Sequence, residues 1–182
     1  FTLARVDDPE ARRQDGALYA LSQYTMFAAG FGTLALGVAR SLQDAFIALA
    51  KAKTPRGFRR ALSEDGPTQY EVGWEEARLR AARAYLRDAL AAAWAEAEHQ
   101  NRLSLEARMG VRLAATYAIR EAKAVGDSAF DAAATSAIFA GSPFERRFRD
   151  LHTVAQQLQG RKSHFRTVGQ YLLGEEVELG WI

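Results

Sequence analysis

The sequence contains no cysteine among its 182 residues. This absence excludes a disulfide scaffold, a cysteine-ligated zinc or iron–sulfur centre and a cysteine nucleophile, so nothing here depends on an oxidising compartment. Histidine is scarce as well: there are three, His99, His152 and His164, and no two have the one-turn spacing of a helical metal site. Glu96 and His99 form a single Glu-x-x-His, whereas a di-iron bundle needs two such motifs and two further glutamates. We therefore predict no metal site.

The chain also lacks a large excess of charge. Its 24 Lys and Arg stand against 22 Asp and Glu, for a net charge of +2, and the basic residues are dispersed among acids. A nucleic-acid partner is not predicted, because a phosphate-binding face needs clustered cations. Arg40, Asp44 and Lys51 interrupt the most apolar stretch, which falls short of the ~18 apolar residues of a membrane span, and no signal peptide is present. We expect a cytoplasmic protein without membrane contact and, since the first residue is Phe1, a fragment of a longer one.

Apolar residues recur at steps of three and four through most of the chain, which is the spacing of a helix with one buried face. The first such stretch begins near Ala17 and ends at Thr54, because the residue before Pro55 is disfavoured in a helix. A second, alanine-rich stripe covers 74–92. A third starts at 105, with Gly126 as its expected interruption.

A fourth helix has the clearest start signal. Ser142 stands at the cap position, Pro143 follows in the first turn, and Gly160 is placed to end the helix. Ser163 is placed to cap a last short helix, whereas the alternation over 1–6 suggests a strand. Together these patterns predict an all-α fold, an elongated antiparallel helical bundle, whose apolar sides must be covered by another domain or another copy of the chain.

The fourth helix is also unusually polar. Arg149 and Thr153 recur at helical spacing, and His152, Gln156 and Gln159 form a neighbouring row. One interpretation is that the charged residues pair with other helices and the glutamines face water. The other is that these side chains form the polar wall of a ligand pocket. Glycines such as Gly30 and Gly32 lack a phosphate-loop context, so close helix packing explains them better.

The run SPFERRFRDLHTVAQQLQGRKSHFRTVGQYLLG, residues 142–174, resembles the C-terminal helical domain of acyl-CoA dehydrogenase-like flavoproteins. It is most similar to the subgroup that includes flavin-dependent aromatic monooxygenases. The segments FAAGFGTLALGVAR (27–40), KTPRG (53–57) and EARLRAARAYL (76–86) match more weakly. The resemblance implies that 1–16 leave a missing middle β domain, that 17–174 form the C-terminal bundle domain and that 175–182 are a tail. It also implies a flavin, FAD being favoured and FMN left open, and a homo-oligomer, a dimer or a tetramer.

The resemblance assigns roles to individual residues. Arg149 and Asp150 match the Arg-Asp that opens the active-site helix, and further matches to polar positions that line the flavin region are His152, Thr153 and Gln156. Arg56 and Gln69 fall near the segment that contacts the flavin phosphates of the adjacent subunit, where Arg59 and Arg60 are equally available. An arginine fork suits a pyrophosphate because its donors meet two oxygens in one plane.

Two departures from the family pattern affect the chemistry. Many acyl-CoA dehydrogenases have a catalytic glutamate before the glycine that closes this helix, whereas this sequence has Gln159, and an amide cannot act as that base. Many monooxygenase-like members continue Gln-His, whereas this sequence has Gln156-Gln157. Gln157 and Gln159 are therefore expected to line the substrate pocket, and His152 is left as the catalytic imidazole.

Two reactions on a small-molecule substrate remain open at this point. One is CH–CH oxidation of an acyl thioester, and the other is monooxygenation of an aromatic substrate with reduced flavin from a partner reductase. In either case this domain would form one wall of the flavin site and the oligomer contact. The alternative is a non-catalytic helical module for oligomerisation or interaction, which both departures from the family pattern favour.

Overall fold

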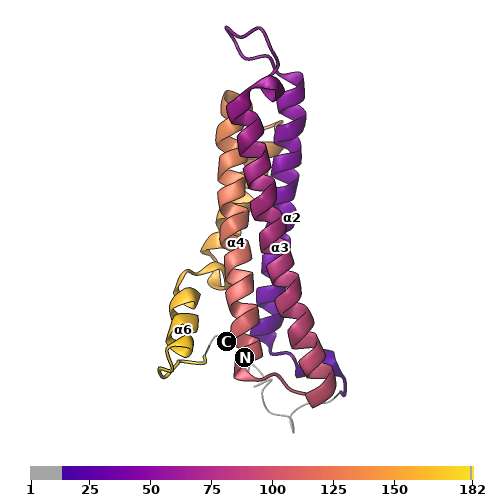
Figure 1. The fold of residues 1–182 in the computed structure, drawn as a ribbon, viewed down its shortest axis with the longest axis vertical. Helices are drawn as coiled ribbons and strands as arrows, with labels where there is room; N and C mark the ends of the chain where they lie inside the picture. The colour runs from indigo at the N-terminus through magenta and orange to yellow at the C-terminus, as the bar shows by residue number, and fades with distance from the viewer. Residues whose placement is uncertain (1–13, 181) are drawn as a thin grey trace.

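The computed structural model describes residues 14–180 and 182, and within them all regular structure is helical (Figure 1). The predicted strand over 1–6 lies outside the described residues. The all-α, elongated antiparallel bundle is confirmed. The α-helices are α1 (Ala17–Ala20), α2 (Gln23–Ala52), α3 (Gly66–Gln100), α4 (Leu105–Ala133), α5 (Pro143–Gln156) and α6 (Ser163–Leu172), and the short 3-10 helices are η2 (Leu62–Glu64), η3 (Ala134–Ser136) and η4 (Leu158–Gly160).

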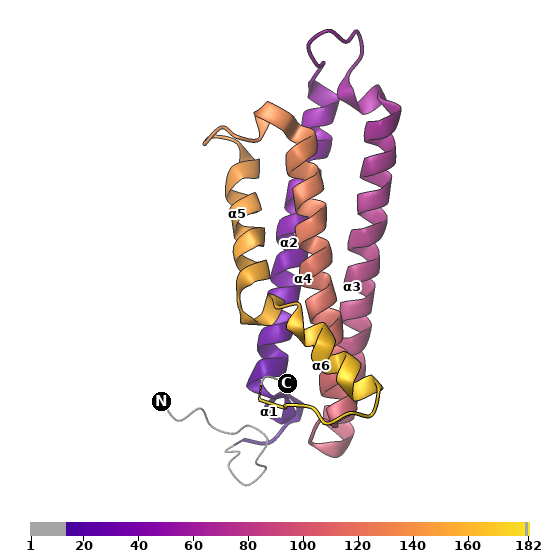
Figure 2. The same ribbon diagram turned by 90° about the vertical axis from the view of Figure 1, so that its left-hand side faces the viewer.

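Each long helix runs opposite to the one before it in the chain, so α2 and α4 are parallel to each other and antiparallel to α3 and α5. α2 and α4 lie side by side in the middle, α3 packs on one side of them, and α5 packs on the other (Figure 2). Within the described residues α3 and α5 do not contact each other. α6 crosses the first half of α4, where Val168 and Ile182 pack on Met109. α5 is therefore an outer helix with one face on the bundle and one face turned away from it.

Side-chain caps explain where the four main helices begin. The side chains of Ser22, Asp65, Ser104 and Ser142 each accept a hydrogen bond from a backbone N–H in the first turn of α2, α3, α4 and α5 respectively. Such caps satisfy donors that a helix start otherwise leaves open. The predicted cap at Ser142 is confirmed. The predicted cap at Ser163 is wrong, because Ser163 is itself the first residue of α6 and its neighbour Lys162 makes no side-chain cap.

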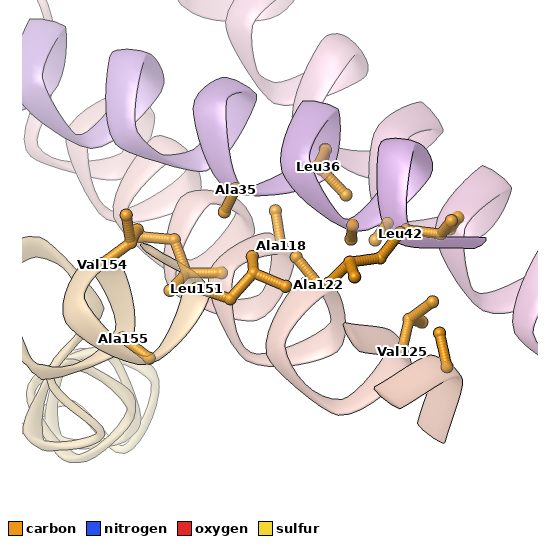
Figure 3. Close-up of a cluster of buried hydrophobic side chains, with 14 of the residues drawn as sticks. Ala35, Leu36, Leu42, Ala118, Ala122, Val125, Leu151, Val154 and Ala155 are labelled. Carbon is orange, nitrogen blue, oxygen red and sulfur yellow. The ribbon is translucent and has the colours of Figure 1, made fainter. Parts of the chain in front are cut away.

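Small residues let α2 and α4 approach closely. Ala35 and Ala39 of α2 and Ala118 and Ala122 of α4 are fully buried in one apolar cluster, to which α5 contributes Leu151 (Figure 3). A methyl group on Gly32 would lie 3.4 Å from the Ala115 backbone, so this glycine serves close packing as expected. Gly30 does not, since nothing lies within 4 Å of the corresponding position. Gly126 does not interrupt α4, which continues to Ala133.

Gly126 instead makes room for α5. A methyl group at this position would overlap Leu151, and it would lie 3.2 Å from Leu42 of α2. Three helices thus meet where one of them has no side chain, and Leu151, 1% exposed, fills the space. This contact fixes the face of α5 that is buried and, with it, the face that is left open.

α2 is also long and apolar enough, by length and composition, to cross a membrane, with a mean hydropathy of 1.2 over its best window. From the sequence, the charges at Arg40, Asp44 and Lys51 are expected to exclude a window of this length. They do not exclude it. Of that window, 39% is buried inside the fold. A helix at the centre of a bundle meets the same criterion, because its neighbours cover it. The absence of membrane contact stays a prediction.

Candidate functional site: the outward face of α5

The open face of α5 carries three of the predicted site residues. Arg149, Thr153 and Gln156 are exposed and follow one another at helical steps of four and three. The opposite face is apolar and buried against α2 and α4; its members are Phe144, Leu151, Val154 and Ala155. The sequence therefore sorts α5 into a face that holds the bundle together and a polar face that looks away from it.

In the described part of the chain, the polar side chains of this face do not hydrogen-bond another helix. Arg149 Nε lies 2.8 Å from Glu145 Oε1, one turn earlier on the same helix. Thr153 Oγ1 donates to the Arg149 carbonyl oxygen at 2.8 Å. Asp150, matched to the family's Arg-Asp, is exposed and lies 4.0 Å from Arg146, also on α5. The alternative in which these residues pair with other helices is therefore not what the structure shows.

His152 lies at the edge of the same face and is tied to α4. Its Nε2 is 2.8 Å from Asp127 Oδ1, and Lys123 bonds the other oxygen of that carboxylate. The ring stacks on Phe148 with centroids 4.2 Å apart, and Phe148 packs in turn on Phe130. The His152 side chain is 37% exposed. The imidazole is thus oriented from the inside and accessible from the outside.

An arginine of α4 holds the end of α5. Arg120 Nη2 donates to the Ala155 carbonyl at 2.9 Å and to the Gly160 carbonyl. A cation at this end of a helix satisfies open carbonyls and complements the helix dipole. Burial lowers the pKa of Arg120, although the guanidinium donates both hydrogen bonds. α5 ends at Gln156, four residues before the Gly160 that was expected to end it. η4 follows over Leu158–Gly160 and turns the chain toward α6.

Gln159 does not share the polar face. Its side chain is 2% exposed and accepts a hydrogen bond from Arg112 Nη1 inside the bundle. Arg112 also donates to the Tyr24 carbonyl of α2 at 3.3 Å, and burial lowers the pKa of Arg112 to about 10. Gln157 is half-buried and uses its Oε1 to accept from the Gln159 backbone N–H at 3.0 Å. That Gln157 and Gln159 line the substrate pocket stays a prediction. The contacts observed for their side chains are with other residues of this domain.

This internal contact carries a prediction about Gln159. Gln159→Leu leaves the buried Arg112 cation without its amide partner, and we expect the free energy of unfolding to fall by about 2–3 kcal/mol. Gln159→Glu supplies a carboxylate to that cation and should retain the stability. It should also bring no thioester oxidation, because the new carboxylate is held by Arg112. Urea denaturation of the complete protein and an acyl-thioester oxidation assay measure the two effects; a gain of oxidation would contradict this account.

The second predicted set lies elsewhere on the molecule. Arg56 is exposed in the loop after α2, and Gln69 is exposed in the first turns of α3, with Nε2 donating to the Ser63 carbonyl at 3.0 Å. Since α3 packs on the side of the bundle opposite α5, these residues do not join the polar face (Figure 2). Arg59 and Arg60, rather than Arg56, line a hollow of about 370 Å³ under the loop.

Sequence reasoning missed the residues of α4 behind the site: Arg112, Arg120, Lys123 and Asp127. They are spaced along one long helix as ordinary polar residues, and Arg112, Arg120 and Asp127 meet their partners only across the bundle. A signal was present for Lys123 and Asp127 alone, whose spacing of four allows an ion pair on a helix. Among the described residues, no three His, Asp or Glu side chains gather as a metal site would require.

Residues 29–160 match the family described as "Acyl-CoA dehydrogenase, C-terminal domain", which is more than half of the chain. The chain belongs to this family. The resemblance that residues 142–174 suggested is therefore confirmed, and it extends to the aromatic monooxygenase subgroup. A curated relative, indole-3-acetate monooxygenase of Pseudomonas putida, is 26% identical over 147 residues, which cover 81% of this chain and 38% of the relative.

Solved structures share the fold. The 3-HSA hydroxylase of Rhodococcus sp. RHA1 matches with a TM-score of 0.82 and 18% identity over 93% of this chain and 44% of that one. XiaF from Streptomyces sp., solved in complex with FADH2 and glycerol, matches with a TM-score of 0.83 and 14% identity. The match covers 97% of this chain and 44% of XiaF. The chain thus spans less than half the length of these relatives.

Proposed function

We propose that this chain is the C-terminal domain of a flavin-dependent oxidoreductase, in which the outward face of α5 forms one wall of the flavin and substrate site. The observation that carries the proposal is that Arg149, Thr153 and Gln156 are presented together on a face that the bundle leaves uncovered. A polar helix face next to an accessible imidazole is suited to a ligand held between this domain and another part of the protein. The family membership and the relatives' names support a flavin and a small-molecule substrate.

The side chains of this face fit a flavin by their chemistry. Arg149 and Gln156 carry N–H donors for ring carbonyl oxygens, and the Thr153 oxygen, which already donates to Arg149, stays an acceptor for a ring N–H. His152 can move a proton at the edge of the face. When bound, a flavin supplies electron transfer and oxygen chemistry, and the protein supplies orientation and exclusion of water. FAD is the proposed flavin, since one structural neighbour was solved with FADH2.

Of the two reactions, we propose monooxygenation of an aromatic substrate, with reduced flavin supplied by a partner reductase. Dehydrogenation of an acyl thioester would use the position of Gln159 for its base, and here that position holds an amide bonded to the buried Arg112. The names of the relatives favour the same choice, and indole-3-acetate is the first substrate to assay. Dehydrogenation is kept as the second reaction because the family as a whole carries the acyl-CoA dehydrogenase description.

The experiment that tests the flavin site is a titration of the complete protein with oxidised and with reduced FAD and FMN, followed by absorbance and fluorescence. Tight binding that favours the reduced form supports the monooxygenase proposal. Tight binding of the oxidised form together with thioester oxidation supports the dehydrogenase. If neither flavin form binds while the protein still assembles, the non-catalytic module replaces both proposed reactions.

Exposed aromatic and aliphatic side chains suit a homo-oligomer, among them Leu34, Tyr70, Trp74 and Trp94.

Two substitutions test whether the flavin binds to α5. Arg149→Ala and Gln156→Ala should each weaken binding of reduced flavin, the arginine by about ten- to a hundredfold, since a hydrogen bond to a charged group contributes about 1.5–3 kcal/mol. Arg83→Ala on α3 is the matched control: it removes an exposed arginine from a helix that does not contact α5. Isothermal titration gives the dissociation constants. Equal dissociation constants for Arg149→Ala and Arg83→Ala would show that the flavin does not bind at this face.

A further inference from the structure

Asp127 of α4 lies behind the polar face and bonds the one imidazole at its edge. We propose that Asp127 is the positioning residue of the site: it holds His152 so that the outer ring nitrogen, Nδ1, is the atom that exchanges a proton with the substrate or flavin. The inference rests on the proposed function for the role of His152, but the Asp127–His152 pair can be tested separately from it. Nothing in the sequence links the two residues, which are 25 positions apart.

Two contacts restrain the imidazole. The hydrogen bond of 2.8 Å joins His152 Nε2 to Asp127 Oδ1, and the stacking on Phe148 at 4.2 Å fixes the plane of the ring. Phe148 is itself supported by Phe130 of α4 at 4.3 Å, so the ring is linked to α4 directly through the carboxylate and indirectly through Phe148. A side chain held by a charge-assisted hydrogen bond and a stacked ring loses few rotamers when a ligand arrives.

The chemistry of the pair determines which nitrogen is free. A carboxylate only accepts hydrogen bonds, so the proton of the neutral ring is on Nε2 and the lone pair is on Nδ1. Within the described residues no other group bonds the His152 ring. His152 is therefore prepared to take a proton at Nδ1, and the imidazolium that forms keeps its hydrogen bond to Asp127 and gains an opposite charge beside it.

The charges around the ring leave this arrangement intact. From α4, Lys123 bonds Asp127 through Oδ2, which leaves Oδ1 to His152. From α5 itself, Arg149 is paired with Glu145. α2, the other helix packed on α5, directs its Arg40 to Glu76 of α3 instead. Asp127 is thus the one carboxylate in the described chain that bonds His152.

The first test uses one-dimensional proton NMR of the complete protein and needs no substrate. A ring N–H held by a carboxylate exchanges slowly enough to give a downfield resonance, which we expect in the wild type and expect to be absent from His152→Ala. Asp127→Ala should abolish it. Asp131→Ala, which removes an exposed carboxylate one turn further along α4, should leave it in place. A wild type without the resonance, or an Asp127→Ala variant that keeps it, overturns the inference.

The second test is a double-mutant cycle on turnover with indole-3-acetate and a flavin reductase. Asp127→Asn should lower kcat by about a hundredfold and change KM by less than about threefold, because a misoriented or wrongly protonated imidazole still admits substrate. In a His152→Ala background the same substitution should have no further effect. An undiminished effect in that background overturns the positioning role. If His152→Ala turns over like the wild type although the wild type shows the downfield resonance, His152 does not carry out the proposed proton transfer. The Asp127–His152 hydrogen bond itself is then still supported.

Discussion

Replacing Gly160 by alanine is expected to lower the free energy of unfolding by at least about 3 kcal/mol, the largest effect on stability that we predict for a one-carbon change. The added methyl group would lie 2.7 Å from the Val154 carbonyl oxygen and 2.9 Å from the Ala155 Cα and carbonyl oxygen. All three are backbone atoms at the end of α5, so no side-chain rotation can relieve the overlap. The shift would also pull the Gly160 carbonyl from Arg120.

Hydrogen exchange and urea denaturation of the complete protein measure this effect. Peptides covering 151–165 should lose protection first, because the end of α5 opens locally. Gly30→Ala is the control, since Gly30 is exposed in α2 with nothing within 4 Å of the added carbon. Alanine in a helix interior is about 0.5–1 kcal/mol more favourable than glycine, so this variant should be slightly more stable than the wild type. Similar midpoints for the two variants would show that η4 is less tightly packed than the contacts imply.

Replacing His152 by alanine is expected to lower kcat at least about a hundredfold, the largest effect on turnover, because proton transfer by a positioned side chain contributes about 10²–10⁴-fold. Flavin binding should change little, since the donors on the open face are on other residues. The variant should remain folded: His152 is 37% exposed, and its loss leaves Asp127 bonded to Lys123. Stopped-flow oxidation of the reduced flavin with and without indole-3-acetate separates binding from turnover.

His99→Ala serves as the histidine control, because His99 is exposed near the end of α3, on the side of the bundle away from α5. It should retain wild-type turnover and flavin affinity. His164→Ala is unsuitable for that purpose. His164 is 5% exposed and donates from Nε2 to the Leu158 carbonyl at 2.8 Å, and burial lowers its pKa, so this side chain is part of the core. Equal turnover in His152→Ala and His99→Ala would remove the imidazole from the chemistry.

The polar row on the fourth helix was partly readable before the fold was known. The spacing predicts that Arg149 and Thr153 lie on one row and Gln156 on the neighbouring row, and the structure exposes all three. The spacing also places Gln159 on the row of His152 and Gln156, and there the structure differs. The chain leaves the helix at Gln157, whose side chain accepts from the Gln159 backbone N–H, so Gln159 turns inward to Arg112. Helical periodicity holds only while the backbone stays helical. A hydrogen bond from a nearby backbone N–H to a glutamine side chain ends the helix here without leaving a signal in the spacing of the residues.

By itself the sequence determined the long helices, the start of α5 and the family. Steps of three and four, the cap at Ser142 followed by Pro143, and the run over 142–174 are local properties, and local properties can be read along a chain. Only the tertiary structure decided which side chains serve the site. Asp127 and His152 are brought together because Leu151 fills the space beside Gly126 and sets the rotation of α5 on α4. That rotation depends on packing between residues far apart in the chain, where van der Waals contact rather than sequence spacing selects the partner.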